Sequence, residues 1–371
     1  MDNVETNALI VGGGVVGTAI ARAFQQKGIE SIVVEKNKYI GDEVSSRNSG
    51  VIHAGFYYPQ DSIKAQLCNS GNKKIYQYCK ENNIFASKYG KLLVSDDFQD
   101  INKFKTYIKN AQACGGAPLR IIDQDEIKKM EPNITSKFGL YSPDTGILDV
   151  PSFIKSLAND FESMGGLISC NSLHIKTKHK NQKYLSHIIT GSDEFSISSN
   201  YLIIAKGLSS DDTAAECISC KIKGIKKNNY TKGHYFRLKG QNPFNHLIYP
   251  IPTKMGLGIH VSFNIDGTVK FGPDAVPVKS LDYTFEEDSQ DIFYKAIKKY
   301  YPDILLTDLA EDYVGIRPKI QRSNESFADF SILSEQQHGY KKFIYLQGIE
   351  SPGLTCSLSL AEHLYKYYIA V

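Results

Sequence analysis

The sequence predicts a mixed fold, in which an α/β domain with a parallel sheet is interleaved with a mostly antiparallel α+β domain. The chain has 371 residues, more than one core usually serves, since single cores stop growing near 250–300 residues. Residues 8–36 read as strand, tight turn, helix, turn and strand, the unit from which parallel sheets are built. Segments that combine a strand with a glycine turn return at 201–211 and 342–364. The α/β domain is therefore expected to be assembled from separated segments.

The first unit has the glycine spacing of a dinucleotide-binding turn. In ALIVGGGVVGTAIARAFQQKGIESIVVEK, Gly12, Gly14 and Gly17 form G-x-G-x-x-G between a strand and a helix. Such glycines permit a tight turn, close approach of a pyrophosphate and close helix–strand packing. Glu35 ends the second strand, where a carboxylate accepts hydrogen bonds from ribose hydroxyls and repels a 2′-phosphate. A bound adenine dinucleotide is predicted, with FAD and NAD both open at this point.

The segment after Glu35 favours FAD. An NAD dehydrogenase would continue into another crossover helix, but residues 37–59 are long, polar and glycine-rich. Their last part, NSGVIHAGFYYP, fits neither the helical period of 3.6 nor the strand period of 2. A loop that starts beside the adenosine can run along the cofactor and reach its reactive ring.

The order of these motifs resembles the FAD-dependent D-amino-acid oxidase superfamily and, within it, the L-2-hydroxyglutarate dehydrogenase family. The resemblance rests on GGGVVG, EK, SRNSGVIHAGFYYP and SIKAQLCNSGNKKIYQYC, and continues in YGKLLV, YSPDTGILDV, GHYFRL and FGPDA. It implies a glutathione-reductase-type flavoprotein with a Rossmann-type FAD-binding domain. We expect that domain at 1–84, 146–216 and 324–371, and a substrate or cap domain at 85–145 and 217–323.

The resemblance also implies which residues contact the cofactor. The loop after Glu35 would lie against the pyrophosphate and the flavin ring. The turn GIESPGLT would place backbone N–H groups and a helix N-terminus near the flavin pyrimidine oxygen. Lys206 departs from the small residue that usually precedes the glycine of the 201–211 element. The expected cofactor-binding residues are Gly12, Gly14, Val16, Gly17, Glu35, Lys36, Ser45, Ser46, Asn48, Ser49, Gly50, Gly207, Gly348, Pro352, Gly353, Leu354 and Thr355.

His53, in NSGVIHAG, is the candidate base for the substrate hydroxyl proton. The alternative is a neutral histidine that hydrogen-bonds the loop or the flavin. Arg317, in YVGIRPK, resembles the arginine that clamps a substrate carboxylate, and its alternative is a surface ion pair. A dicarboxylic substrate needs a second cationic or donor-rich pocket. The candidates for it are Arg237, His234, His260, Tyr235 and Tyr249, with His260 facing either the site or a packed layer.

The predicted reaction is FAD-dependent oxidation of L-2-hydroxyglutarate, or a close 2-hydroxy acid, to the 2-oxo acid by hydride transfer to flavin N5. One alternative is an amino-acid or amine oxidase of the same fold, and another is a flavin-bound assembly factor without turnover. The family implies a membrane quinone as electron acceptor, and oxygen stays open.

Composition excludes several other classes. The formal charge of +3 is far from the basic face that nucleic-acid binding requires. No apolar run approaches the ~20 residues of a membrane span, and the start of the sequence does not read as a secretory signal. Seven scattered cysteines, with one CxxC at Cys217 and Cys220, predict neither a disulfide framework nor a metal site. We expect a cytoplasmic protein, with at most peripheral contact at the inner membrane.

Overall fold

The computed structural model describes residues 3–210, 222, 224–252, 258–321 and 325–370. The chain divides into two compact units. Unit 1 comprises Met1–Ser46, Val150–Tyr230 and Arg317–Val371, and unit 2 comprises Arg47–Asp149 and Thr231–Ile316.

Unit 1 is built on an eight-stranded sheet. The strand order is β10-β11-β12-β1-β2-β9, with β20 pairing β12 and β19 pairing β20. β1 is parallel to both β12 and β2, and β20 is parallel to β12. The strands are β1 (Asn3–Val11), β2 (Ser31–Val34), β9 (Leu167–Ser169), β10 (Ser172–Lys180), β11 (Lys183–Thr190), β12 (Asp193–Ile204), β19 (Ser331–Leu333) and β20 (Phe343–Gln347).

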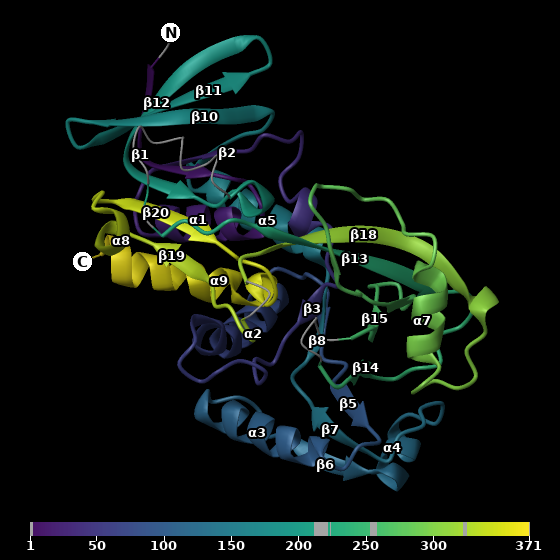
Figure 1. Cartoon of the computed structure of the whole chain (residues 1–371). Coiled ribbons are helices and arrows are strands. Elements are labelled where there is room, and N and C mark those ends of the chain that lie inside the picture. Colours follow the sequence, from purple (N-terminus) through teal and green to yellow (C-terminus); the bar gives the residue numbers. More distant parts are fainter. Residues whose placement is uncertain (1–2, 211–221, 223, 253–257, 322–324, 371) are drawn as a thin grey trace. The chain divides into compact units, whose positions relative to one another are not determined.

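Helices cover the parallel part of this sheet. Helix α1 contacts both α5 and α9, and the three lie together beside the strands in Figure 1. Each presents an apolar stripe inward, as Ala19, Ile20 and Phe24 do on α1, so burial of that stripe holds the layer. The helical elements of unit 1 are α1 (Val15–Gln26), α5 (Val150–Ser163), α8 (Glu335–His338), α9 (Gly353–Leu364), the short 3₁₀ turns η1 (Glu43–Ser45) and η2 (Gly207–Ser209), and the π-helical end η4 (Tyr365–Ile369).

The predicted Rossmann-type arrangement is confirmed. The 8–36 unit forms β1, α1 and β2, and the two later segments supply β12 and β20 to the same sheet. Four apolar residues at the end of β1 are almost fully buried, because a parallel strand is covered on both faces.

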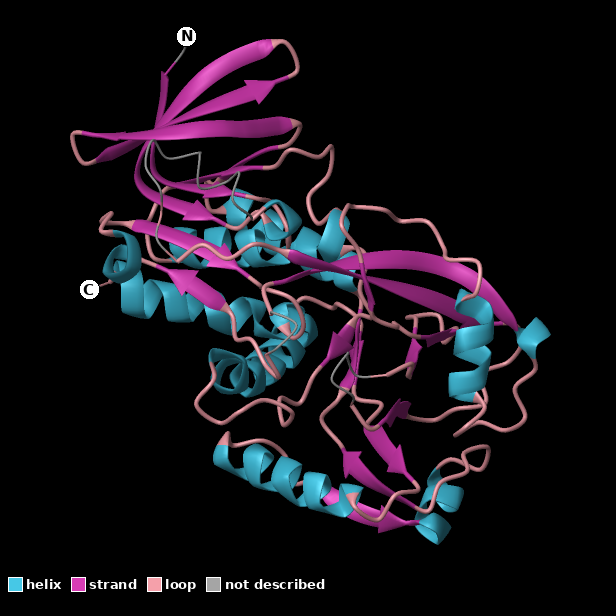
Figure 2. Cartoon of the chain, viewed as in Figure 1, coloured by secondary structure: helices cyan, strands magenta, loops and turns pink. Residues whose placement is uncertain are grey.

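Unit 2 consists of several small sheets, mostly antiparallel, as Figure 2 shows. One has the order β14-β5-β7-β6, another β15-β16-β13-β17 with β18 on β13, and a third β3-β8-β4. Only β14 and β5 form a parallel pair among the ladders described in this unit. The strands are β3 (Val51–Ile52), β4 (Ala86–Ser87), β5 (Lys91–Ser95), β6 (Arg120–Asp123), β7 (Phe138–Ser142), β8 (Gly146–Leu148), β13 (Asn229–Leu238), β14 (Leu247–Pro250), β15 (Val261–Phe263), β16 (Val269–Phe271), β17 (Val276–Pro277) and β18 (Leu309–Lys319).

The core of unit 2 joins these sheets to its helices. Phe104 on α3 packs edge-on against Phe138 on β7, and Phe236 on β13 packs against Phe293 on α7. The helical elements are α2 (Ile63–Glu81), α3 (Asp100–Ala113), α4 (Gln124–Met130), α7 (Ser289–Ile297) and the 3₁₀ turn η3 (Leu306–Asp308).

The limits of the units differ from the predicted domain limits at residues 146–149, 224–230 and 317–321, and most of all at residues 47–84. We expected this segment in the FAD-binding domain, but it belongs to unit 2. Helix α2 shows the reason, because the amide of Asn69 donates to Cys114 O, and that of Asn72 donates to Asp144 O and to His53 O. The expected boundaries at 216/217 and 323/324 lie outside the described residues. The assignment of a substrate or cap role to unit 2 stays a prediction.

Candidate functional site

The glycine turn between β1 and α1 is packed too closely for side chains. Gly12 has φ of +113°, and a Cβ there would collide with Ala205 O at the end of β12. A Cβ at Gly17 would collide with Gly12 O. The Ala205 N–H also donates to Val11 O at 2.8 Å. The turn before Gly207 therefore returns the chain to Gly12.

Glu35 lies at the carboxyl end of β2 with 7% of its surface exposed. Its carboxylate accepts hydrogen bonds from Gly13 N at 2.7 Å and from Asn37 N at 2.8 Å. A carboxylate offers about four acceptor positions, so capacity remains for the two hydroxyls of a ribose. The residue types and their placement fit an adenosine at this position.

The N-terminus of α1 fits a pyrophosphate. Its N-cap is Gly14, which offers no side-chain cap, and its first turn contains no acidic residue. Ser45 Oγ accepts from Val15 N at 3.0 Å, so the predicted loop residue does lie at this helix end. No carboxylate of the helix's own first turn therefore neutralises the positive end of the helix dipole. Val16 is half-buried on the same first turn.

Two other predicted cofactor residues near this turn are exposed. The ammonium of Lys36 pairs with Glu43 at 2.7 Å and donates to Ser209 Oγ, while the hydroxyl of Ser46 donates to Glu43 O. Lys36 thus links the loop to η2, and Ser46 bonds within the loop. Their contact with FAD stays a prediction.

A second helix N-terminus in unit 1 occurs where the sequence placed the flavin pyrimidine. Helix α9 begins at Gly353 after Pro352, again without a side-chain cap and without an acid in its first turn. Thr355 is fully buried and Leu354 is half-buried. Gly348 precedes the turn and packs against Ile320, the residue after β18. Gly353 N donates to Glu350 O within this turn, and the positive end of a helix dipole at such a position favours a negative charge.

Arg317 is half-buried on β18, within unit 1. Two residues later, Lys319 lies 3.8 Å from Glu350 of the turn before α9. The carboxylate clamp and the surface ion pair both remain consistent with this position of Arg317.

The loop that carries NSGVIHAG is held by two tyrosines of unit 2. Tyr235 and Tyr313 stack with ring centroids 4.3 Å apart and an angle of 20°. The Tyr235 hydroxyl lies 3.0 Å from Ser49 Oγ, and the Tyr313 hydroxyl donates to Asn48 O at 2.7 Å. Asn48 Oδ1 in turn accepts from Gly50 N. The predicted flavin-facing loop is therefore fixed by side chains from β13 and β18.

His53 is half-buried beside a buried cluster in unit 2. The pKa of His53 falls to about 3, mainly because burial disfavours the charged ring, and also because of Lys91 and His260. The imidazole is therefore neutral at physiological pH, the form that can accept a proton. The amide of Asn72 donates to His53 O at 3.0 Å, which fixes the backbone at this residue.

His260 faces this cluster rather than a separate packed layer. Its ring stacks on Tyr249 with centroids 3.9 Å apart and an angle of 17°. Its Nδ1 lies 3.0 Å from Gly258 O, so Gly258 O accepts a hydrogen bond from an Nδ1–H tautomer. The sequence candidates His53, His260 and Tyr249 are thus brought together.

The sequence interpretation missed one member of this cluster, Lys91 at the start of β5. Its side chain is fully buried, and its ammonium lies 4.6 Å from the ring centroid of Phe56, 4.5 Å from Tyr57 and 4.7 Å from Tyr249. Burial lowers the pKa of Lys91 to about 7. The signal was the lysine in YGKLLV directly before an apolar run, which ordinarily marks an exposed strand end.

Two candidates for a second carboxylate pocket lie elsewhere. Arg237 is exposed on β13, so its guanidinium does not line a dry anion pocket. His234 lies on the opposite face of β13 from Tyr235, because strand neighbours alternate. Its Nδ1 and its backbone N–H both pair with Asp274, at 2.9 Å and 2.8 Å.

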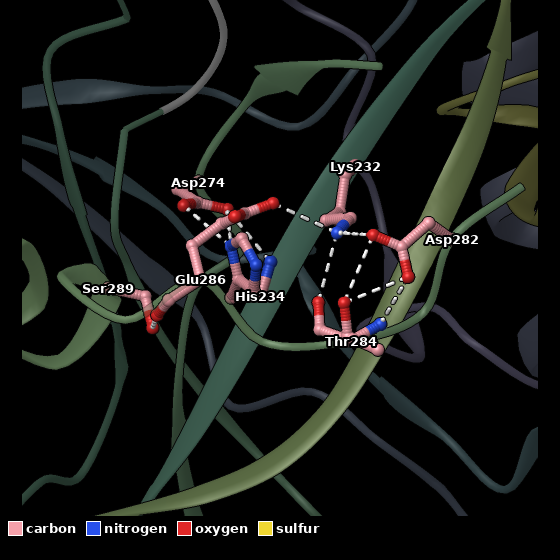
Figure 3. Close-up of polar contacts among 7 residues, drawn as sticks. All are labelled: Lys232, His234, Asp274, Asp282, Thr284, Glu286 and Ser289. Carbon is pink, nitrogen blue, oxygen red and sulfur yellow. Dashed lines mark hydrogen bonds and ion pairs between the residues drawn. The ribbon is translucent and has the colours of Figure 1, made fainter. Parts of the chain in front are cut away.

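Figure 3 shows His234 beside a second buried lysine on the same face of β13. Lys232 donates to Asp282 at 2.7 Å, to Thr284 O at 3.0 Å and to Glu286 at 3.0 Å. We interpret this network as a structural anchor for residues 274–289.

Comparison with known proteins decides the family. The model of the family described as FAD dependent oxidoreductase matches residues 7–366. This chain belongs to the FAD dependent oxidoreductase family. It is 33% identical to the mitochondrial L-2-hydroxyglutarate dehydrogenase of Arabidopsis thaliana over 98% of this chain and 83% of that protein. It is 27% identical to the L-2-hydroxyglutarate dehydrogenase of Indibacter alkaliphilus over 96% of this chain and 97% of that protein.

Solved structures agree on the fold. L-alpha-glycerophosphate oxidase from Mycoplasma pneumoniae with FAD bound superposes with a TM-score of 0.87 at 23% identity, over 100% of this chain and 96% of that chain. Glycine oxidase from Geobacillus kaustophilus gives a TM-score of 0.80 at 15% identity, over 99% and 95%. The D-amino-acid-oxidase-like fold, the FAD cofactor and the oxidoreductase class expected from the sequence are thus confirmed.

The described residues contain neither a membrane-spanning helix nor a metal-binding group of side chains. No helix there combines the length and apolarity needed to cross a bilayer. No group of three or more histidine, cysteine, aspartate or glutamate side chains there could hold a metal ion. Cys217 and Cys220 lie outside the described residues.

Proposed function

We propose that this chain catalyses FAD-dependent oxidation of L-2-hydroxyglutarate, or of a close 2-hydroxy acid, to the corresponding 2-oxo acid. The observation that carries the proposal is the 33% identity to an L-2-hydroxyglutarate dehydrogenase over nearly the whole chain. Agreement over the full length covers both the FAD-binding segments and the segments of unit 2 that contain His53 and Lys91.

Separate residues of this chain bind the cofactor, accept the proton and bind the substrate carboxylate. The β1–α1 turn, Glu35 and the N-terminus of α9 hold FAD, which when bound supplies the acceptor for a hydride from the substrate carbon. His53 receives the hydroxyl proton, because its buried imidazole is neutral before substrate arrives. Arg317 binds the carboxylate next to the hydroxyl-bearing carbon. A guanidinium suits that task, since it pairs with a carboxylate through two parallel hydrogen bonds.

An anaerobic titration of the holoenzyme tests the proposal. L-2-Hydroxyglutarate is expected to bleach the absorbance band of the oxidised flavin, and the D enantiomer is expected to leave it unchanged. Titration with L- and D-amino acids separates this reaction from an amino-acid oxidase. Bleaching by amino acids alone would contradict the proposal, and no bleaching by either class would favour an assembly factor without turnover.

We also propose a membrane quinone as the electron acceptor and the cytoplasm, with peripheral contact at the inner membrane, as the location. Free thiols at Cys68, Cys79, Cys114, Cys170 and Cys356 are usual in a reducing compartment. The test is to compare quinone reduction with peroxide release during turnover, and to fractionate cells. Peroxide in amounts equal to the oxidised substrate would identify oxygen as the acceptor.

A further inference from the structure

Lys91 is in an unusual environment for a lysine. Its Nζ is buried and has no hydrogen-bond partner among the described residues. An ammonium removed from water without a partner is destabilised by the loss of its hydration. The three aromatic rings around it offset part of that cost through cation–π attraction. The remaining deficit is what an anionic ligand would supply.

Two hydroxyl groups next to Lys91 also lack a hydrogen-bond partner among the described residues. The hydroxyls of Tyr57 and Tyr249 are buried and have no hydrogen-bond partner within the described part of the chain, although both rings contact the Lys91 ammonium. Buried polar groups in native proteins are nearly always hydrogen-bonded. One cation and two hydroxyls without partners therefore belong to the same buried cluster, and a carboxylate is a ligand that can pair with an ammonium and accept from hydroxyls.

The position also relates this group to the reaction. The charge of Lys91 lowers the pKa of His53, so the two side chains are within electrostatic reach inside unit 2. Tyr249 links Lys91 to His260, because its ring contacts the Lys91 ammonium and stacks on the His260 ring, and His260 also lowers the pKa of His53. A substrate whose hydroxyl faces His53 would direct its far end into this neighbourhood.

We propose that Lys91, with the hydroxyls of Tyr57 and Tyr249, binds the remote carboxylate of a dicarboxylic 2-hydroxy acid and so selects dicarboxylates over monocarboxylates. This inference rests on the proposed function and names the specificity-determining residue of that site. In L-2-hydroxyglutarate two methylene groups separate the hydroxyl-bearing carbon from the remote carboxylate. Lys91 replaces the candidates Arg237 and His234 in this role.

The test compares two substrates and two lysine variants of the holoenzyme. The substrates are L-2-hydroxyglutarate and L-2-hydroxypentanoate, which has the same chain length but ends in a methyl group. Lys91→Met is expected to lower kcat/KM for the dicarboxylate about 10- to 100-fold, mainly through KM, since a charge-assisted pair in a buried site is lost. The same variant is expected to change kcat/KM for hydroxypentanoate by less than about threefold.

Lys270→Met is the matched control. Lys270 is also a buried lysine of unit 2, but its ammonium lies over the ring of Tyr313 and not among the rings of Phe56, Tyr57 and Tyr249. This variant is expected to leave the ratio between the two substrates unchanged. Tyr57→Phe keeps the ring and removes the hydroxyl, so a severalfold loss confined to the dicarboxylate supports the proposal even if Lys91→Met fails to fold.

Binding of glutarate separates this inference from the proposed function. Glutarate has both carboxylates and no hydroxyl, so calorimetry on the oxidised holoenzyme reports the carboxylate pocket without turnover. Lys91-dependent binding of glutarate, with pentanoate much weaker, would support the pocket even if no 2-hydroxy acid were oxidised. An equal loss on both substrates in Lys91→Met, or glutarate binding unchanged by it, would overturn the inference and leave the reaction standing.

Discussion

At His53 and Lys91, burial acts on two bases in the same direction. Each charged form is disfavoured, so the pKa of His53 falls to about 3 and that of Lys91 to about 7. His53 was identifiable from the sequence because it lies in a specific glycine-rich segment. Lys91 was not, because only the approach of Phe56, Tyr57 and Tyr249 buries it, and Tyr249 is distant in the sequence.

Replacing His53 tests the base assignment. His53→Asn is expected to lower the anaerobic rate of flavin reduction by L-2-hydroxyglutarate about 10²- to 10⁴-fold, the usual contribution of a general base. Stopped-flow absorbance measures this rate, and FAD content and melting temperature serve as controls for folding. A near wild-type rate would assign His53 to the alternative, a neutral histidine that supports the loop.

The pH dependence of kcat/KM follows from Lys91. A lysine with a lowered pKa is protonated below about 7 and loses its charge above it, so kcat/KM for the dicarboxylate is expected to fall as pH rises from 7 to 9. The groups that face Lys91 are His53, Tyr57, Tyr249 and Cys68, with His260 stacked behind Tyr249. His53 is already neutral in this range.

The pKa values of Tyr57 and Tyr249 are raised by burial, so these hydroxyls keep their protons as well. Profiles measured with L-2-hydroxyglutarate and with L-2-hydroxypentanoate isolate the lysine. Titration of a group that both reactions require would change kcat/KM with pH for both substrates. Titration of Lys91 would change it only for L-2-hydroxyglutarate. Parallel profiles would therefore contradict the assignment.

Among the elements, the β1–α1–β2 unit was predicted correctly because its signals are local. Hydrophobic period, glycine spacing and the acid after the second strand all occur within residues 8–36. The limits of unit 1 do not coincide with those of the predicted first segment, for the opposite reason. Helix α2 has an ordinary helical sequence, and the side-chain bonds that join it to residues 53, 114 and 144 of unit 2 come from distant parts of the chain.

A substitution in the glycine turn tests FAD retention. Gly17→Ala brings a methyl group into Gly12 O, so the turn must open and the purified protein is expected to lose most of its FAD. Gly28→Asn is the control, because Gly28 has φ of +75° with open space around it, a conformation that asparagine tolerates. The flavin-to-protein absorbance ratio measures the outcome, and full FAD content in Gly17→Ala would refute the tight packing.

The Lys232 network makes a separate prediction for the segment it anchors. Hydrogen bonds from the Lys232 ammonium and from the backbone N–H of Thr284 lower the pKa of Asp282 to about 2, against 3.8 for the free side chain. The stabilisation is therefore present above pH 3.8 and disappears as pH falls through about 2. Lys232→Met is expected to expose residues 282–286 to limited proteolysis near neutral pH. Cleavage rates equal to wild type would show that the segment does not depend on this lysine.

For the whole molecule, the sequence predicted an interleaved two-domain architecture because β12 and β20 each carry a recognisable strand and turn. It did not predict the limits of the units, since these depend on contacts between distant segments. The chain passes from one unit to the other after Ser46, Asp149, Tyr230 and Ile316. Neither unit is a continuous stretch of chain.

This interleaving determines when the molecule can fold during synthesis. β1 emerges first, yet its partner β12 follows almost two hundred residues later, and β20 and α9 come last of all. A nascent chain therefore holds β1 and α1 with β2 but without β12, α5 and α9 until much later in translation, the interval in which chaperones protect such apolar surfaces. A premature stop before Phe343 would remove a strand from the FAD-binding sheet and one of its helices, and would leave an aggregation-prone fragment instead of a shorter flavoprotein.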